Sequence, residues 1–400
     1  MFRILYAESD ATFYEHESEA NTGLDEVLEV GKRQWTAGAD LVKSRSAIKF
    51  NMTEVQNTLT KYSVNLDSCK FMLQLYTTNA CELPAEYTVD ANILAQPWIN
   101  GTGMLSSNPL KTNGARWTEP AASWSLDSQT YTSQSVNVDG NLWISSSQEI
   151  RVNGSSLYVS GSGNGGSWLW QSGSGTFNLS YFNQSFFHQP GLTENESFSY
   201  RVSDINMDVT DAIKLWISGS GGRSIHNNGF LLKFSDTDES NSNEGIIRFF
   251  SRETDTIYVP KLVMYFDNSE YSSSLDQIDI DSYLSYCKLK PTYKDIEVSK
   301  IRIYARDKFP RKSPTNKFPI ETVKRLPNTT YYAIRDAATD EYIIPFDDIY
   351  NKVSCDSTSN FIHVDMNNFM PERYYRLEFK ITDGVTEHYI DDDMYFKVVR

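Results

Sequence analysis

Three alternating runs between positions 228 and 266 constrain the fold of this chain more than any other feature. Each run places every second side chain on the same side of an extended backbone, because successive side chains of a β-strand point to opposite faces. The pattern therefore predicts three strands that each present one face to a core. The runs read NNGFLLKFSD, IIRFFSRET and YVPKLVMYF.

A short helix is predicted just before these strands, in DVTDAIKLW. Val209, Ile213 and Trp216 recur at helical spacing and form one apolar face. Asp208 or Thr210 can cap the first turn, and the glycines of 219–222 would end the helix. We interpret 208–266 as the closing half of a β-sandwich with a helix at one end.

The first part of the chain has the same β-rich character. FRILYAESDATFYE indicates a strand, a polar break and a second strand, and SRSAIKFN alternates cleanly. EVQNTLTKYSV predicts a short helix, and CKFMLQLYTT predicts a strong strand after it. With the runs above, these elements predict an N-terminal sandwich over residues 1–268.

The segment from 88 to 200 differs in composition, being rich in tryptophan, glycine, serine and asparagine. Asp-Gly at 139–140 and Asn-Gly at 153–154 stand between alternating runs, which is the strongest short signal for a β-hairpin. We expect residues 126–191 to form hairpins inserted into the first sandwich.

A second domain is predicted after an acidic, serine-rich linker at 269–285. Residues 286–400 hold five or more short strands separated by turns such as Asp383-Gly384, which is typical of an immunoglobulin-like or fibronectin-like sandwich. The predicted fold class is therefore all-β, with two sandwiches.

Charge and hydropathy restrict the function. The chain has 37 basic and 52 acidic residues, and 37 − 52 gives −15. An acidic chain is poorly suited to a nucleic-acid backbone, so no nucleic-acid partner is expected. No secretory leader and no run of 18 apolar residues is seen, which predicts no membrane span. Four cysteines without metal-site spacing favour buried free thiols, with a Cys69–Cys81 bridge as the alternative.

No catalytic motif is found, so we expect a protein that is not an enzyme and that needs no cofactor. Acidic residues cluster at 204–211 and at 236–239, where capping and solvated loops are the simplest interpretation. A calcium site in these loops is the weaker alternative, because Asp236-Thr237-Asp238-Glu239 lacks the full ligand pattern of a calcium loop.

Trp168 and Trp170 are the best candidates for a binding role. They stand in a glycine- and serine-rich context, where an aromatic side chain is expected to be exposed. An exposed tryptophan can stack on a sugar or anchor a protein partner. The other tryptophans considered are expected in the core.

The chain resembles a known family in several of these blocks. The resemblance rests on MDVTDAIKLW, NNGFLLKFSD and IRFFSRET, with PWINGTG and ARW before them. These blocks look like the DNRLRE-type sandwich, which is similar to certain carbohydrate-binding modules. With the C-terminal ARDKFPRKSP, YYAIRDAATDEYIIPFDD and ERYYRLEFKI, the chain resembles virion structural proteins of tailed bacteriophages.

This resemblance implies a jelly roll followed by an immunoglobulin-like domain, and a structural role in the virion. The tail or baseplate is the expected place, with the neck or capsid surface as alternatives. It implies assembly in the host bacterial cytoplasm, other virion proteins as partners, and a homo-oligomeric or ring-like assembly. The alternative is a protein that resembles a carbohydrate-binding module and recognises host-surface glycans.

Overall fold

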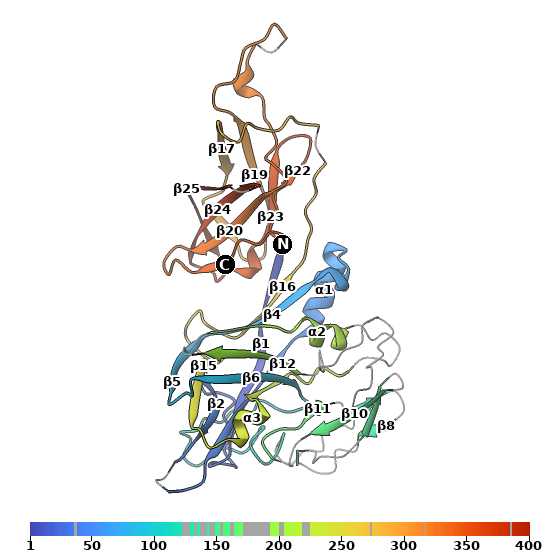
Figure 1. The fold of residues 1–400 in the computed structure, drawn as a ribbon, viewed down its shortest axis with the longest axis vertical. Helices are drawn as coiled ribbons and strands as arrows, with labels where there is room; N and C mark the ends of the chain where they lie inside the picture. The colour runs from blue at the N-terminus through green and yellow to red at the C-terminus, as the bar shows by residue number, and fades with distance from the viewer. Residues whose placement is uncertain are drawn as a thin grey trace. The chain divides into compact units, whose positions relative to one another are not determined.

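The protein is described by a computed structural model of residues 1–400 apart from 36–37, 122–128, 132–133, 137–141, 144–148, 153–154, 161–163, 171–192, 200–203, 218–224, 273, 316 and 385. It folds into two compact units. The N-terminal unit comprises Ile4–Lys61 and Lys70–Met264, and the C-terminal unit comprises Met1–Arg3, Tyr62–Cys69 and Tyr265–Arg400. Both units are built of largely antiparallel sheets, with one parallel pair, β18 (Thr292–Lys294) and β25 (Thr386–Val399), in the C-terminal unit, and they contain few helices (Figure 1). The predicted all-β class is confirmed.

The N-terminal unit is organised around an eleven-stranded sheet. Its main path runs β12-β6-β14-β3-β1-β16-β4-β13, and β2, β15 and β5 extend it from β3. Its strands are β1 (Phe2–Tyr14), β2 (Val27–Arg33), β3 (Val42–Phe50), β4 (Lys70–Leu75), β5 (Thr77–Cys81), β6 (Glu86–Ile93), β12 (Thr193–Ser199), β13 (Ile205–Asp208), β14 (Phe230–Phe234), β15 (Gly245–Phe250) and β16 (Lys261–Tyr265).

The three alternating runs form β14, β15 and β16, as predicted, but the prediction of a single core face is wrong for β14 and β16. All five residues of each strand are buried, including Lys233 in β14. In β14 the reason is that side chains from other segments cover both faces. Phe230 packs on Trp216, with ring centroids 4.7 Å apart, and on the opposite face Lys233 Nζ lies 5.0 Å from the Trp168 ring centroid.

The first strand is longer than its sequence suggests. β1 continues through the polar residues ESDAT, where a break was predicted. The structure has a bulge at this point, seen as a register shift between Ala7 and Ser9 against β3. A bulge absorbs one extra residue without ending the strand. The polar residues therefore mark an irregularity in one strand.

Both predicted helices are present, as α1 (Met52–Tyr62) and α2 (Thr210–Ile217), and a third short helix is α3 (Asp236–Ser240). The Asp208 carboxylate accepts the Thr210 N–H at 3.0 Å, so Asp208 caps α2. Ile213 and Trp216 are buried on its apolar face. The glycine turn predicted at 219–222 lies outside the described residues.

The predicted hairpin at Asn153-Gly154 is confirmed by the strands that flank it. Val152 pairs with Ser155, so the chain reverses direction between them. The turn residues 153–154, and the Asp-Gly turn at 139–140, lie outside the described residues. The strands of this region are β7 (Gln129–Tyr131), β8 (Gln134–Val136), β9 (Glu149–Val152), β10 (Ser155–Ser160) and β11 (Trp168–Trp170).

The C-terminal unit contains two sheets, ordered β17-β19-β23-β22 and β18-β25-β24-β20-β21. The predicted turn at Asp383-Gly384 joins β24 to β25. The strands of the C-terminal unit are β17 (Tyr283–Lys288), β18 (Thr292–Lys294), β19 (Val298–Asp307), β20 (Thr330–Asp336), β21 (Tyr342–Ile344), β22 (Ser354–Cys355), β23 (Asn360–Asp365), β24 (Tyr374–Asp383) and β25 (Thr386–Val399). Its 3-10 turns are η1 (Leu66–Ser68), η2 (Pro319–Glu321) and η3 (Met366–Asn368).

The acidic segment at 269–285 forms backbone hydrogen bonds with other residues of the C-terminal unit. Ser272 donates its N–H to the Cys355 carbonyl, and Ile278 donates to the Arg325 carbonyl, each at 3.0 Å. Strand β17 begins within this segment, at Tyr283. The segment therefore forms part of the C-terminal unit.

Candidate functional site

Large apolar side chains that remain exposed are concentrated in the C-terminal unit. Among the residues that the structure describes, eighteen such side chains occur, and thirteen of them belong to this unit. A contiguous exposed apolar surface is typical of an interaction site, and the residues that follow β19 and strand β17 itself carry five of these side chains. The thirteen are Tyr271, Leu284, Tyr286, Ile296, Val298, Phe309, Phe318, Ile320, Tyr342, Ile349, Tyr374, Tyr389 and Tyr395.

Three of these side chains lie on a projection that we call the arm, residues 308–315 and 317–322. It follows β19 and extends away from the strands of its own unit (Figure 1, orange). Phe309 is 78 % exposed and Phe318 is 71 % exposed. The arm contains three prolines, which lack an N–H donor and fix one backbone angle. These prolines explain why the arm forms neither a long helix nor a strand.

The same part of the chain carries a local excess of positive charge. Residues 288–325 contain twelve basic and four acidic residues, and 12 − 4 gives +8. The rest of the chain then carries −15 − 8 = −23. The dispersed negative charge suggested by the whole-chain total is therefore a poor description of this segment. Counting charge along the sequence, in place of the total, would have revealed it.

Edge strand β17 and its neighbour β19 contribute a mixed aromatic and basic face. Tyr286 pairs with Tyr304, and their rings stack with centroids 5.1 Å apart. Lys288 pairs with Arg302 next to them. β17 lies at the edge of its sheet, where unpaired backbone groups can accept a strand of another chain. This face therefore combines apolar, cationic and backbone binding groups.

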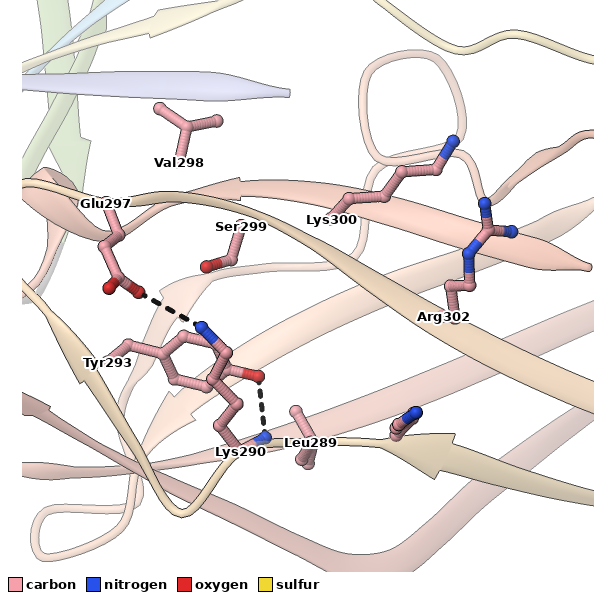
Figure 2. Close-up of a pocket in the computed structure, with 9 residues that line it drawn as sticks. Leu289, Lys290, Tyr293, Glu297, Val298, Ser299, Lys300 and Arg302 are labelled. Carbon is pink, nitrogen blue, oxygen red and sulfur yellow. Dashed lines mark hydrogen bonds and ion pairs between the residues drawn. The ribbon is translucent and has the colours of Figure 1, made fainter.

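A pocket of about 470 Å³ opens at the end of this face (Figure 2). Tyr293 lines the pocket, and its hydroxyl oxygen accepts a hydrogen bond from the Lys290 backbone N–H at 2.9 Å. The Lys290 Nζ lies 3.7 Å from a Glu297 carboxylate oxygen. Lys288, Lys300 and Arg302 also line the pocket, so its charged side chains are mostly basic.

One carboxylate partly neutralises this wall. Asp356 lies 3.0 Å from the Lys300 Nζ and 3.1 Å from Arg302 Nη2. The hydrogen bonds from Arg302 are the main reason that the pKa of the Asp356 carboxyl lies well below its ordinary value. Because one carboxylate serves two cations, the face keeps a net positive charge.

The expectation that Trp168 is exposed is wrong. Its side chain is 9 % exposed and packs in a core cluster of the N-terminal unit. Arg45 Cζ and Lys233 Nζ lie 5.3 Å and 5.0 Å from its ring centroid. The aromatic face is thus covered by two cations from β3 and β14. The side chain of Trp170 lies outside the described residues.

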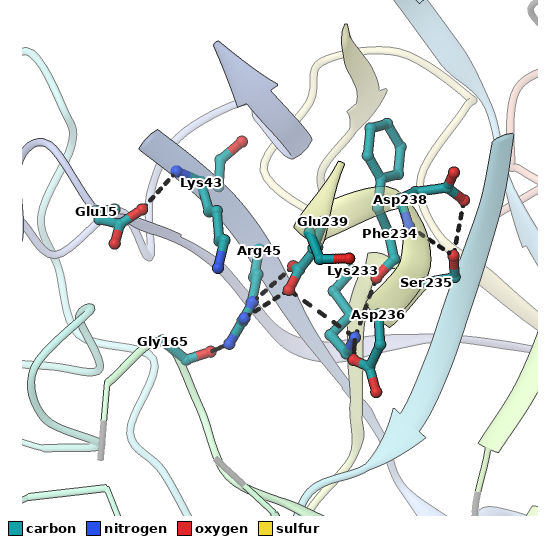
Figure 3. A network of polar contacts seen from close by, with 12 residues as sticks. Glu15, Lys43, Arg45, Gly165, Lys233, Phe234, Ser235, Asp236, Asp238 and Glu239 are labelled. Atoms are coloured by element: carbon teal, nitrogen blue, oxygen red, sulfur yellow. Dashed lines mark hydrogen bonds and ion pairs between the residues drawn. The ribbon is translucent and has the colours of Figure 1, made fainter. Parts of the chain in front are cut away.

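Those two cations belong to a polar network that anchors α3 (Figure 3). Arg45 donates two hydrogen bonds to the Glu239 carboxylate, at 2.7 and 2.9 Å, and one to the Gly165 carbonyl at 3.0 Å. The Lys233 Nζ lies 2.5 Å from an Asp236 oxygen. The acidic cluster expected at 236–239 therefore serves capping and ion pairing.

The weaker calcium interpretation gains no support from this cluster. Glu239 and Asp236 face the cations described above, and Asp238 accepts the Thr88 N–H at 3.0 Å. Across the described ranges, no group of three or more histidine, cysteine or acidic side chains is arranged to hold a metal ion.

Sequence reasoning missed Trp35, which is 45 % exposed. Its ring stacks on His16 with centroids 3.6 Å apart, and the Arg33 Cζ lies 3.6 Å from the ring centroid. Arg33 also lines a hollow of about 490 Å³, where Arg248 pairs with Glu29 at 2.8 Å. A count of exposed tryptophans requires the fold, so no sequence signal identifies Trp35.

All four cysteines are free. Cys69 and Cys355 are buried, whereas Cys81 is exposed and Cys287 is half-buried, so the expectation of buried thiols holds only in part. In the part of the chain that the structure describes, no helix has the length and apolar character needed to cross a membrane. The chain matches no protein-family model, and a comparison with curated proteins finds no match.

Proposed function

We propose that this chain is a non-enzymatic structural component of a tailed-bacteriophage virion, acting through protein–protein contacts in a multi-subunit assembly. The observation that carries the proposal is the concentration of exposed apolar side chains in the C-terminal unit, on the arm and beside edge strand β17. A subunit that stays alone in solution would leave this surface in contact with water. The tail or baseplate is the proposed location, with the neck or capsid surface as alternatives.

The sequence resemblance supports the same role, with a jelly roll and an immunoglobulin-like domain as the finer description of the two units. Stable interfaces bury on the order of 1,200 Å² or more. Edge backbone, two exposed phenylalanines and a basic face together offer the kinds of contact that such an interface uses.

The test is to add the purified full-length chain to particles assembled in its absence and then to sediment the particles. We expect saturable binding of the chain to the particles. A chain that remains in the supernatant at every concentration, and that binds no isolated particle protein, would refute the proposal.

Recognition of host-surface glycans is the second candidate, and Trp35 favours it. An exposed indole beside a hollow that presents guanidinium donors and carboxylate acceptors suits a hydroxyl-rich ligand. Calorimetry with host polysaccharides should then show binding that Trp35→Ala abolishes. This function would be contradicted if the wild-type chain gave no heat of binding, or if the wild-type chain and Trp35→Ala gave equal heats of binding.

A further inference from the structure

The arm is pinned at its base, and its phenyl rings are exposed. The Lys324 Nζ lies 2.5 Å from an Asp307 carboxylate oxygen, and the Lys324 N–H donates to the Ala305 carbonyl at 2.8 Å. The chain therefore leaves and rejoins the sandwich at one place. Three prolines restrict the backbone between these points, which lowers the conformational entropy that binding would cost.

The side chains of the arm combine apolar and cationic groups. Phe309, Phe318 and Ile320 are 78 %, 71 % and 61 % exposed. Four cations are exposed between and beside them, and one acidic residue, Glu321, lies near the end. A complementary surface would be acidic and would cover two phenyl rings. The four cations are Lys308, Arg311, Lys312 and Lys317.

The chain itself contains a unit of the required charge. The N-terminal unit has 17 basic and 28 acidic residues, and 17 − 28 gives −11. The C-terminal unit has 20 basic and 24 acidic residues, which gives −4, and because 288–325 carries +8 the rest of this unit carries −4 − 8 = −12. Outside 288–325, both units of a second copy are therefore acidic and complement the cations of the arm.

We propose that the arm of one chain docks onto an acidic surface, outside 288–325, of a second copy of this chain. This inference rests on the proposed function, because it names one contact and one partner of the assembly. A contact between different surfaces of identical chains is heterologous, so it builds a ring or an open filament. The arm would supply the apolar anchors and the charge that selects the partner.

The first test measures self-association of the full-length chain by analytical ultracentrifugation. Phe309→Ser combined with Phe318→Ser should weaken association about 100-fold or more, because two phenyl rings are no longer buried. The matched control is Ile296→Ser combined with Ile349→Ser, which removes two apolar side chains that are 80 % and 58 % exposed elsewhere in the unit. Equal association of the two double variants, or a wild-type chain that stays monomeric, would overturn the proposal.

The second test identifies the partner surface. A photoreactive phenylalanine analogue is placed at Phe309, and the chain is prepared as an equal mixture of light and heavy isotopic forms. We expect light-to-heavy cross-links from position 309 to peptides outside 288–325, where both units are acidic. Cross-links confined to one chain, or directed to 288–325 of the other, would overturn the assignment. Binding of the arm to DNA, without self-association of the chain, would also overturn the assignment.

The outcomes separate this inference from the proposed function. If the chain binds particles normally but the phenylalanine variant self-associates like the wild type, the role of the arm is wrong and the structural function stands. If the chain neither binds particles nor self-associates, the proposed function itself fails.

Discussion

The substitution Glu239→Gln should destabilise the N-terminal unit, because the carboxylate that it removes lies between two buried cations. The side chains of Glu239 and Arg45 are each 8 % exposed and meet at 2.7 Å. Lys233, whose side chain is 1 % exposed, lies 4.0 Å from the same carboxylate. Glutamine keeps the size of the side chain but leaves Arg45 without its counter-charge.

Removing one partner of a buried ion pair costs about 3–5 kcal/mol, because the remaining charge stays desolvated. With an m-value of about 2–3 kcal/mol/M, the urea midpoint should fall by about 1 M or more. Tryptophan fluorescence measures this unit selectively, because all eight tryptophans belong to it.

The matched control is Glu253→Gln. Glu253 pairs with Arg252 at 3.0 Å, but their side chains are 30 % and 36 % exposed, so the loss should stay below about 1 kcal/mol. Equal midpoints for Glu239→Gln and the control would refute the reasoning, because the network of Figure 3 would then be no more than a surface contact.

Three further predictions concern individual residues. Burial raises the pKa of the Asp10 carboxyl to about 7, so stability should fall as the pH rises from about 4 through 7. Asp10→Asn should flatten that slope in pH-dependent unfolding, and an unchanged slope would contradict it. Gly229 has φ = 90°, and a Cβ at this position would lie 2.4 Å from the Ile48 carbonyl oxygen. Gly229→Ala should therefore lower the free energy of unfolding, measured in urea, by about 2 kcal/mol or more. A smaller decrease would show that the turn relaxes around the new side chain. A thiol reagent should label Cys81 in the native chain and Cys69 only after unfolding, and rapid native labelling of Cys69 would contradict its burial.

Local pattern was sufficient to predict the principal elements of the fold. Period-two alternation predicted β14, β15 and β16, and helical spacing with an aspartate cap predicted α2. These signals lie within a few residues, so they need no knowledge of distant contacts. The burial of both faces of β14 depends on side chains from other segments, with Trp216 on one face and Trp168 on the other. Alternation alone cannot reveal that.

The exposure of the candidate site residues depends more strongly on contacts between residues that are distant in the sequence. Trp168 lies in a glycine- and serine-rich segment, yet cations from β3 and β14 cover its ring. Trp35 gave no signal, because its exposure follows from the packing of its neighbours. The basic character of 288–325 was readable from the sequence but was hidden by the net charge of −15. Local charge therefore describes this segment better than total charge does.

The most direct test of the structural role is immunogold labelling of intact phage particles with an antibody against this chain. The account predicts gold at one fixed place on every particle, such as the tail end or the neck. Particles without label, with the protein confined to the soluble lysate, would contradict a virion role and would favour the glycan-binding alternative.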